Sequence, residues 1–416
     1  MEIKFKIDKG YLRYLYCLVI LLLPLSVINI TSFYSVSSPS EIWYKYKSFN
    51  FSVLIIPFII YAMCIRKKSY AIRFDIIIVA IAIKDIIFSF INGQNSLITF
   101  DFSLYLIMIS AWALTVVVMK KVKNTNSVPG VAFFEAYFWV AFLTILVRLA
   151  LGMTTDGRYG AIGLSVGGTG FFAGVYILYL IYVRPFTKNT PVFLILSFLV
   201  LVLSGQRTNL LFCIVFCALY AIRQFFLINN ADATTNNKSL LLWGLLCVGI
   251  IFIIGLFLIN EMGIHITDIN YITRMFDAVE KFLGGSLNSE DSVRGRLNSI
   301  DAGLQILKEN PLGILNVFYD LQYRMTIFNY PTFPHCTLLA CALLWSTPIT
   351  IICEIWLISL LIKLSRMKSD MFWVILYMQV LLLFWGGPFL DFPMLFIVLL
   401  LLSMAQYIVS QDTALV

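Results

Sequence analysis

Long runs of apolar residues follow one another along this chain, separated by short polar segments. A helix needs about 20 apolar residues to cross the ~30 Å hydrocarbon core of a bilayer. The runs are continuous, whereas the strands of a transmembrane barrel would alternate apolar and polar residues over ~10 positions. The pattern therefore predicts an all-α integral membrane protein with about twelve transmembrane helices. They are expected at residues 14–34, 49–65, 74–92, 99–119, 131–150, 168–184, 191–206, 208–227, 239–260, 336–362, 371–385 and 392–409.

One long polar segment, residues 261–335, interrupts this pattern. It divides the chain into transmembrane helices 1–9 at residues 1–260, a large loop at 261–335, and transmembrane helices 10–12 at 336–416. Compact proteins seldom contain a structureless connection of this length, and long loops on a rigid scaffold often carry function. We therefore expect the chemistry of this protein to involve the loop.

The loop contains a predicted amphipathic helix. Its apolar residues are spaced by three, four and three positions and so share one helical face: Leu297, Ile300, Leu304 and Leu307. Asp291 or Ser292 can cap the N-terminus of this helix, and Pro311 ends it. A helix of this kind lies on the bilayer surface and would aim Arg296, one turn before Ile300, at the depth of a lipid pyrophosphate.

Composition supports a membrane protein and excludes a soluble one. Hydrophobic residues make up 60% of the chain and charged residues 12%, against about 45–50% and about 25% in soluble domains. The net charge of +8 would suit a nucleic-acid-binding protein, but the Lys and Arg clusters fall in alternate loops, beginning at the N-terminus. This positive-inside distribution explains the charge by topology, without nucleic acid. Both termini are then cytoplasmic, and the large loop lies on the opposite side.

Cysteine usage gives no sign of a metal or disulfide site. Seven of the eight cysteines lie inside predicted helices, and Cys336 lies at a membrane edge. No Cys-x-x-Cys pair occurs, so the sequence predicts neither a disulfide framework nor a zinc site, and no cofactor. The apolar run near the N-terminus is long for a signal peptide, and we interpret it as an uncleaved first helix.

A group of cationic residues remains on the side that the positive-inside rule leaves poor in charge. An anionic ligand would compensate for it, because the planar guanidinium fork binds phosphate through two charge-assisted hydrogen bonds. Ordinary ion pairing is the alternative, although many acidic residues of the loop lie at expected helix starts. The group includes Arg148, Arg158, Arg207, Arg294, Arg296 and Arg324.

Lys84 and Asp85 are adjacent charged residues inside a predicted helix. Adjacent helical positions diverge by about 100°, so the two need not pair with each other. Asp75, Asp101 and Glu135 are alternative partners. Charges within a membrane are candidates for function by default, and a structural tie between helices is an equal alternative here.

His335 follows Pro334 and begins the tenth predicted transmembrane helix. An unperturbed histidine pKa lies near neutrality, which makes this residue the natural general base beside the arginine group. A purely structural role is the equal alternative. His265 has no such surroundings and is expected to be structural. Asp391, in the last external turn, can orient an arginine or a histidine.

Three short motifs occur in order along the chain: Ser204-Gly-Gln-Arg207-Thr after a predicted helix, Arg296 fifteen residues before Pro311-x-Gly313, and His335 at the end of the loop. Together they resemble the landmarks of the O-antigen polymerase and O-antigen ligase superfamily of bacterial envelope glycosyltransferases. Arg158-Tyr-Gly160 resembles a fourth, weaker element of that family.

The resemblance implies a GT-C-like glycosyltransferase of the bacterial inner membrane with cytoplasmic termini and a periplasmic active site. Its substrate would be an undecaprenyl-pyrophosphate-linked oligosaccharide. Arg207 and Arg296 would neutralise the leaving pyrophosphate without a metal ion, and His335 would be the base. The family usually has Asn after the histidine, so whatever that amide does falls to a group other than Cys336, or to none. Substrate binding is expected of Arg148, Arg158, Arg294, Arg324 and Asp391.

Two activities fit this resemblance. A polymerase transfers the growing lipid-linked glycan to a new lipid-linked repeat unit, and a ligase transfers it to lipid A-core. No residue names the acceptor, but richness in Ile, Phe, Asn, Lys and Tyr, as in the AT-rich genes of O-antigen clusters, favours the polymerase. A chain-length regulator in the membrane is then a candidate partner. A flippase or transporter is less favoured, because the repeated halves typical of transporters are not visible.

Overall fold

Helices account for all the regular structure of the described residues, apart from an isolated antiparallel bridge between Ser69 and Lys120. The computed structural model describes residues 56–91, 102–120, 131–151, 159–160, 166–183, 189–227, 291–316, 318–328, 334–384 and 392–412. The helices expected at 14–34 and 239–260, and the first part of the large loop, lie outside these ranges. The all-α class is confirmed for the part of the chain that is described.

The helices of the first half follow the apolar runs closely. They are α3 (Ile56–Ile65), α4 (Phe74–Ile91), α5 (Phe102–Val118), α6 (Val131–Ala150), α7 (Val166–Leu178) with its π-helical continuation η4 (Tyr179–Val183), α8 (Thr190–Leu203) and α9 (Arg207–Leu227). From α4 to α9 each helix begins and ends within a few residues of its prediction. Apolar runs of this length are therefore a reliable guide to these helices.

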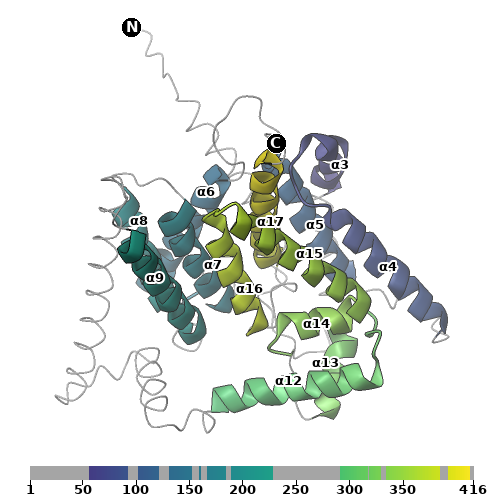
Figure 1. Ribbon diagram of the computed structural model, residues 1–416. Helices are drawn as coiled ribbons and strands as arrows, with labels where there is room; N and C mark the ends of the chain where they lie inside the picture. The colour runs from purple at the N-terminus through teal and green to yellow at the C-terminus, as the bar shows by residue number, and fades with distance from the viewer. Residues whose placement is uncertain are drawn as a thin grey trace.

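The second half contains α12 (Asp291–Glu309), α13 (Phe318–Ile327), α14 (Thr337–Leu344), α15 (Thr347–Arg366), α16 (Met371–Leu383) and α17 (Phe392–Asp412). α12 is the amphipathic helix predicted within the loop, and it begins and ends as its capping residues and Pro311 indicate. In Figure 1 it lies along the lower edge of the bundle, across the direction of α9 and α16, with α14 beside it.

The single helix predicted at 336–362 is wrong, because the chain breaks between α14 and α15. Ser346 adopts a left-handed φ of 115°, and its hydroxyl accepts a hydrogen bond from the amide of Ile349 at 3.4 Å. Pro348 lies in the first turn of α15, where its missing N–H is tolerated. The break lets α14 run beside α12 while α15 leaves in another direction (Figure 1).

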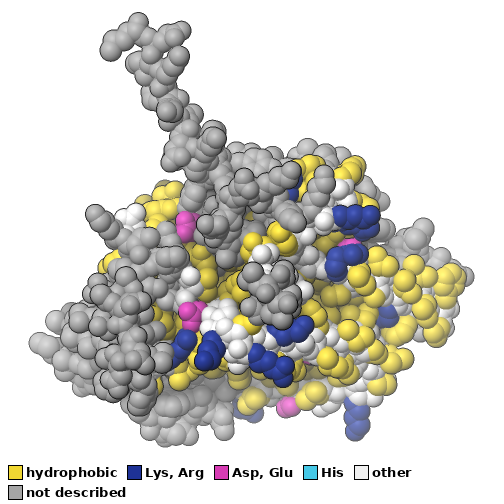
Figure 2. Space-filling view, turned by 45° about the horizontal axis from the view of Figure 1, so that its top comes forward, with side chains coloured by type: hydrophobic (Ala, Val, Ile, Leu, Met, Phe, Trp, Pro, Cys, Tyr) yellow, Lys and Arg dark blue, Asp and Glu magenta, His cyan; other side chains and the backbone are white. Residues whose placement is uncertain are grey.

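Several described helices present apolar faces to their surroundings. Thr347–Arg366 and Met394–Gln411 are long and apolar enough to cross a bilayer, judged by length and composition. Ile352 and Ile355 on α15, and Ile83 and Phe90 on α4, are exposed. Figure 2 shows hydrophobic side chains over much of the described surface. Such faces are unfavourable in water and suit a helix surrounded by lipid.

The interior of the bundle is built around α7 and α17. α17 packs against α5, α15, α16 and α7, and α7 packs against α8, α9 and α16. Tyr176 and Tyr179 of this helical stretch are fully buried. A rigid group of helices thus carries the turn that joins α8 to α9, which is one side of the site described next.

Candidate active site

Helix α12 uses two neighbouring faces for two purposes. Its buried face carries small residues, Ser299, Ala302 and Gly303, and packs against α14. The predicted leucine stripe lies beside this face and remains partly open, with Leu304 51% exposed. The helix was therefore predicted correctly, but its buried face consists of small residues and Ile306 rather than of the predicted stripe.

Two glycines allow α12 and α14 to approach each other. A Cβ atom at Gly303 would lie 2.8 Å from Leu339 Cδ2 and 2.9 Å from Pro334 Cγ. Gly313 has a φ of +91°, and a Cβ there would lie 2.6 Å from the carbonyl oxygen of Leu343. The Pro311-x-Gly313 break thus ends α12 and returns the chain against the C-terminal end of α14.

Ser299 joins the loop arginine to the histidine that precedes α14. Its hydroxyl donates to the Arg296 carbonyl at 2.7 Å and accepts from the backbone N–H of His335 at 3.0 Å. The side chain of Ser299 is 0% exposed. The structure therefore brings together two of the predicted catalytic residues, through a serine that sequence reasoning missed.

The surroundings of His335 favour its neutral form. The pKa of His335 is lowered from its ordinary value of 6.5, first because the imidazole is largely buried and second because the positive charge of Arg296 disfavours a second charge nearby. A neutral imidazole can accept a proton at neutral pH. The site thus holds the histidine in the state that a general base requires.

Arg296 also connects α12 to the bundle. Its guanidinium Nη1 donates to the hydroxyl of Thr208 at 2.9 Å. Thr208 follows Arg207 in the first turn of α9, directly after the turn formed by Ser204, Gly205 and Gln206. The backbone of Arg207 therefore starts α9 beside Arg296, although its side chain lies outside the described residues. N–H groups at this helix start also favour an anion.

The segment at 159–160 lies against the same turn. The amide of Tyr159 donates to the carbonyl of Leu203 at 3.0 Å, and Arg148 Nη1 donates to the carbonyl of Gly160 at 2.8 Å. Arg158 lies outside the described residues, and its neighbour Tyr159 contacts the C-terminal end of α8. The observed contact of Arg148 is with the backbone of this element.

Of the remaining predicted substrate-binding residues, the structure describes Arg294 and Arg324. Arg324 forms an ion pair with Asp320 within α13, with Nε and Oδ1 3.2 Å apart. Arg294 is exposed on α12, two positions and so about 200° away from Arg296 around the helix. Asp391 lies outside the described residues. Within the part that the structure describes, no three His, Cys, Asp or Glu side chains are grouped to hold a metal ion.

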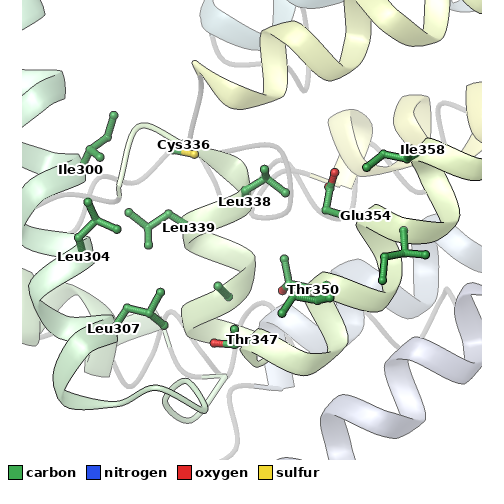
Figure 3. Close-up of a pocket in the computed structure, with 13 residues that line it drawn as sticks. Ile300, Leu304, Leu307, Cys336, Leu338, Leu339, Thr347, Thr350, Glu354 and Ile358 are labelled. Carbon is green, nitrogen blue, oxygen red and sulfur yellow. The ribbon is translucent and has the colours of Figure 1, made fainter. Parts of the chain in front are cut away.

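A groove opens between α12, α14 and α15 (Figure 3). It has a volume of about 410 Å³, and most of its lining is apolar, including Ile300, Leu304 and Leu307 of the predicted stripe. Cys336, Thr347, Thr350 and Glu354 supply its few polar groups, and Glu354 accepts a hydrogen bond from Gln379 at 2.8 Å. Ile300 is one turn from Arg296, so an apolar chain in the groove would lie next to the cationic site.

The structure also shows the partners of the charged residues of α4. Lys84 and Asp85 pair with each other, with Nζ and Oδ1 2.7 Å apart. Asp75 instead pairs with Arg66 and Arg73. Of the partners that the sequence left open, Lys84 thus pairs with its neighbour Asp85.

Comparison with known families adds one match. A family model described as O-antigen ligase matches residues 192–343, less than half of the chain. The matched segment includes α9, α12 and α13, nearly all of α8 and α14, and hence Arg207, Arg296 and His335. No curated protein matches the chain.

Proposed function

We propose that this chain, whose residues 192–343 match the O-antigen ligase family model, is an O-antigen polymerase. In this role it transfers a growing glycan from undecaprenyl pyrophosphate to a new lipid-linked repeat unit at the periplasmic side of the inner membrane. The observation that carries the proposal is the connection of His335 to Arg296 through Ser299, which sets a base beside a cationic site.

The proposed reaction needs a base and a stabilised leaving group. An acceptor hydroxyl attacks the anomeric carbon of the donor sugar while the bond from that carbon to the pyrophosphate oxygen breaks. His335 takes the hydroxyl proton, which its lowered pKa allows at neutral pH. Arg296 and Arg207 hold and neutralise the departing pyrophosphate, which leaves still attached to its lipid.

The groove supports a donor that carries a lipid. Its apolar walls suit a hydrocarbon chain, and it begins one turn from Arg296. A pyrophosphate bound by Arg296 would therefore direct its polyprenyl chain along Ile300, Leu304 and Leu307. Cys336 lines the groove close to His335, so the position of the family's usual asparagine faces the lipid here.

Other residues are assigned to substrate binding rather than to the chemical step. Arg148 acts through the backbone of Gly160, and Arg158 is assigned to substrate binding from its place in the Arg-x-Gly element of the sequence. Arg294 is exposed near the start of α12 and meets the sugar chain or the second phosphate. Weaker contributions come from Arg324 and Asp391.

Single substitutions test this assignment. Removing one charge-stabilising donor lowers a rate by roughly 10²–10³, and removing a general base by roughly 10²–10⁴. Arg207→Ala, Arg296→Ala and His335→Ala are each expected to abolish the glycan ladder on a lipopolysaccharide gel while the protein remains in the membrane. The control is Arg366→Ala, at the end of α15, which should keep the ladder. Normal ladders from all three variants would contradict the assignment.

The ligase is the second candidate, because the matching family model carries that description. Deletion of the gene separates the two. A core bearing one repeat unit identifies the polymerase, whereas bare core with accumulating lipid-linked polymer identifies the ligase. Bare core without periplasmic polymer would indicate a flippase and overturn both.

A further inference from the structure

An ion pair is buried in the middle of α4, away from the arginines of the site. Lys84 is 9% exposed and Asp85 is 2% exposed. Replacing such a pair by well-packed apolar residues often leaves stability unchanged or improves it. Stability alone therefore gives no reason to keep two charges inside a membrane helix, and their other contacts need an explanation.

Those contacts are with the backbone that follows α12 and ends α14. Lys84 Nζ donates to the carbonyl of Ile314 at 2.7 Å and to the carbonyl of Leu344 at 2.6 Å. With Asp85 as the third acceptor, all three ammonium donors are used. Leu344 is the last residue of α14, and the last carbonyls of a helix find no hydrogen-bond donor within that helix. The lysine thus satisfies two buried carbonyls that belong to different segments.

Asp85 holds the same segment from its other side. Its Oδ1 accepts from the backbone N–H of Asn316 at 3.1 Å, and its Oδ2 accepts from the hydroxyl of Tyr105 on α5 at 2.6 Å. The amide of Ile314 donates to the carbonyl of Leu343 at 2.7 Å. The non-helical stretch 313–316 is therefore fixed to α4, α5 and α14 together.

These contacts determine where α12 and α14 lie relative to the bundle. The two helices are joined near one end by Ser299 and His335, and near the other by Ile314 and Leu343. The pair in α4 attaches this second end to the transmembrane helices. The first end must then meet α9, where Arg296 contacts Thr208.

We propose that Lys84 and Asp85 are positioning residues for glycosyl transfer. They hold the α12–α14 unit so that Arg296 and His335 face the start of α9 in the geometry that the reaction needs. The inference rests on the proposed function, because it assumes that these two side chains act in transfer. Displacements of about 1 Å in such an arrangement can lower a rate by about 100-fold.

The test is the double variant Lys84→Met/Asp85→Leu, which removes both charges and leaves neither unpaired. The variant is purified in nanodiscs and assayed with an undecaprenyl-pyrophosphate-linked oligosaccharide. We expect a lower thermal midpoint, because the buried carbonyls of Ile314 and Leu344 and the amide of Asn316 lose their partners. In the protein that remains folded, we expect a donor KM within about threefold of the wild type and kcat lower by about 100-fold. Hydrogen exchange at residues 313–316 should become faster. The matched control is Arg223→Met/Asp370→Leu, which removes an ion pair between α9 and the α15–α16 turn and should keep the wild-type kcat.

A wild-type kcat in the folded Lys84→Met/Asp85→Leu protein would overturn the inference. Should that variant fail to fold, Tyr105→Phe decides, because it removes only the hydroxyl that holds Asp85. It is expected to lower kcat about fivefold, and an unchanged kcat would overturn the inference. The proposed polymerase function is contradicted by a different result, which is that Arg296→Ala and His335→Ala keep their activity.

Discussion

Replacing Ser299 with alanine tests the link between the proposed base and the proposed leaving-group site. The hydroxyl of Ser299 donates to the Arg296 carbonyl at 2.7 Å and accepts from the amide of His335 at 3.0 Å. Ser299→Ala removes both contacts without adding volume. The Arg296 carbonyl lies within α12 and keeps its helical hydrogen bond, so the main loss falls on the His335 amide.

The size of the effect follows from burial. Ser299 is 0% exposed, so water cannot easily replace its oxygen. An unsatisfied buried N–H costs about 1–3 kcal/mol. If that cost appears as displacement of His335, transfer slows by about fivefold to about 150-fold, at ~1.36 kcal/mol for each factor of ten.

The assay is the initial rate of glycan transfer in nanodiscs at saturating donor, normalised to the amount of folded protein. Asn298→Ala is the matched control, since Asn298 is the exposed neighbour on the same helix. It should retain the wild-type rate. A Ser299→Ala protein with the wild-type rate would refute the reasoning that this serine places the base.

Three further predictions follow from the same geometry. Gly313→Ala should lower the thermal midpoint, because the left-handed φ costs about 1–2 kcal/mol and the new Cβ would meet the Leu343 carbonyl at 2.6 Å; an unchanged midpoint in a thermal scan would contradict this. The transfer rate should fall on acidification with a midpoint below 6.5, because burial and Arg296 lower the His335 pKa and the neutral base persists to lower pH. In labelled His265→Gln protein, the imidazole NMR signal should titrate below pH 6.5, and Arg296→Gln should raise that pKa; a midpoint above 6.5 before the arginine change would count against it. Leu304→Gln places a polar group in the groove wall and should raise KM several-fold for the long-chain donor but not for a short-prenyl analogue; equal effects on both donors would argue against the groove.

The sequence predicts the helices well where a local pattern determines them. The run at 131–150 coincides with α6, and the Leu297–Leu307 stripe lies within α12. The break at Ser346 was missed because apolar residues continue on both sides of it, and the only local signal is the short Ser346-Thr-Pro348 motif. Hydrophobic length alone does not separate one long helix from two shorter ones.

Parts of the site depend on contacts between distant segments. The sequence motifs identified Arg296 and His335, but Ser299 attracted no attention because a single serine in an amphipathic helix is common. The sequence left the partner of Lys84 open, because the carbonyls of Ile314 and Leu344 also orient its side chain. Contacts to such backbone acceptors cannot be predicted from residue types or from their spacing.

The open side of the groove has a consequence for how a lipid-linked donor would enter and how its carrier lipid would leave. Ile351, Ile355 and Ile358 of α15 line the groove and are also exposed on the outer surface of the helices. In the proposed reaction, the lipid-linked donor would therefore arrive by lateral diffusion in the plane of the membrane, and the spent carrier would leave by the same route without passing through water. Turnover should then respond to the surface density of the carrier in the bilayer rather than to its bulk concentration.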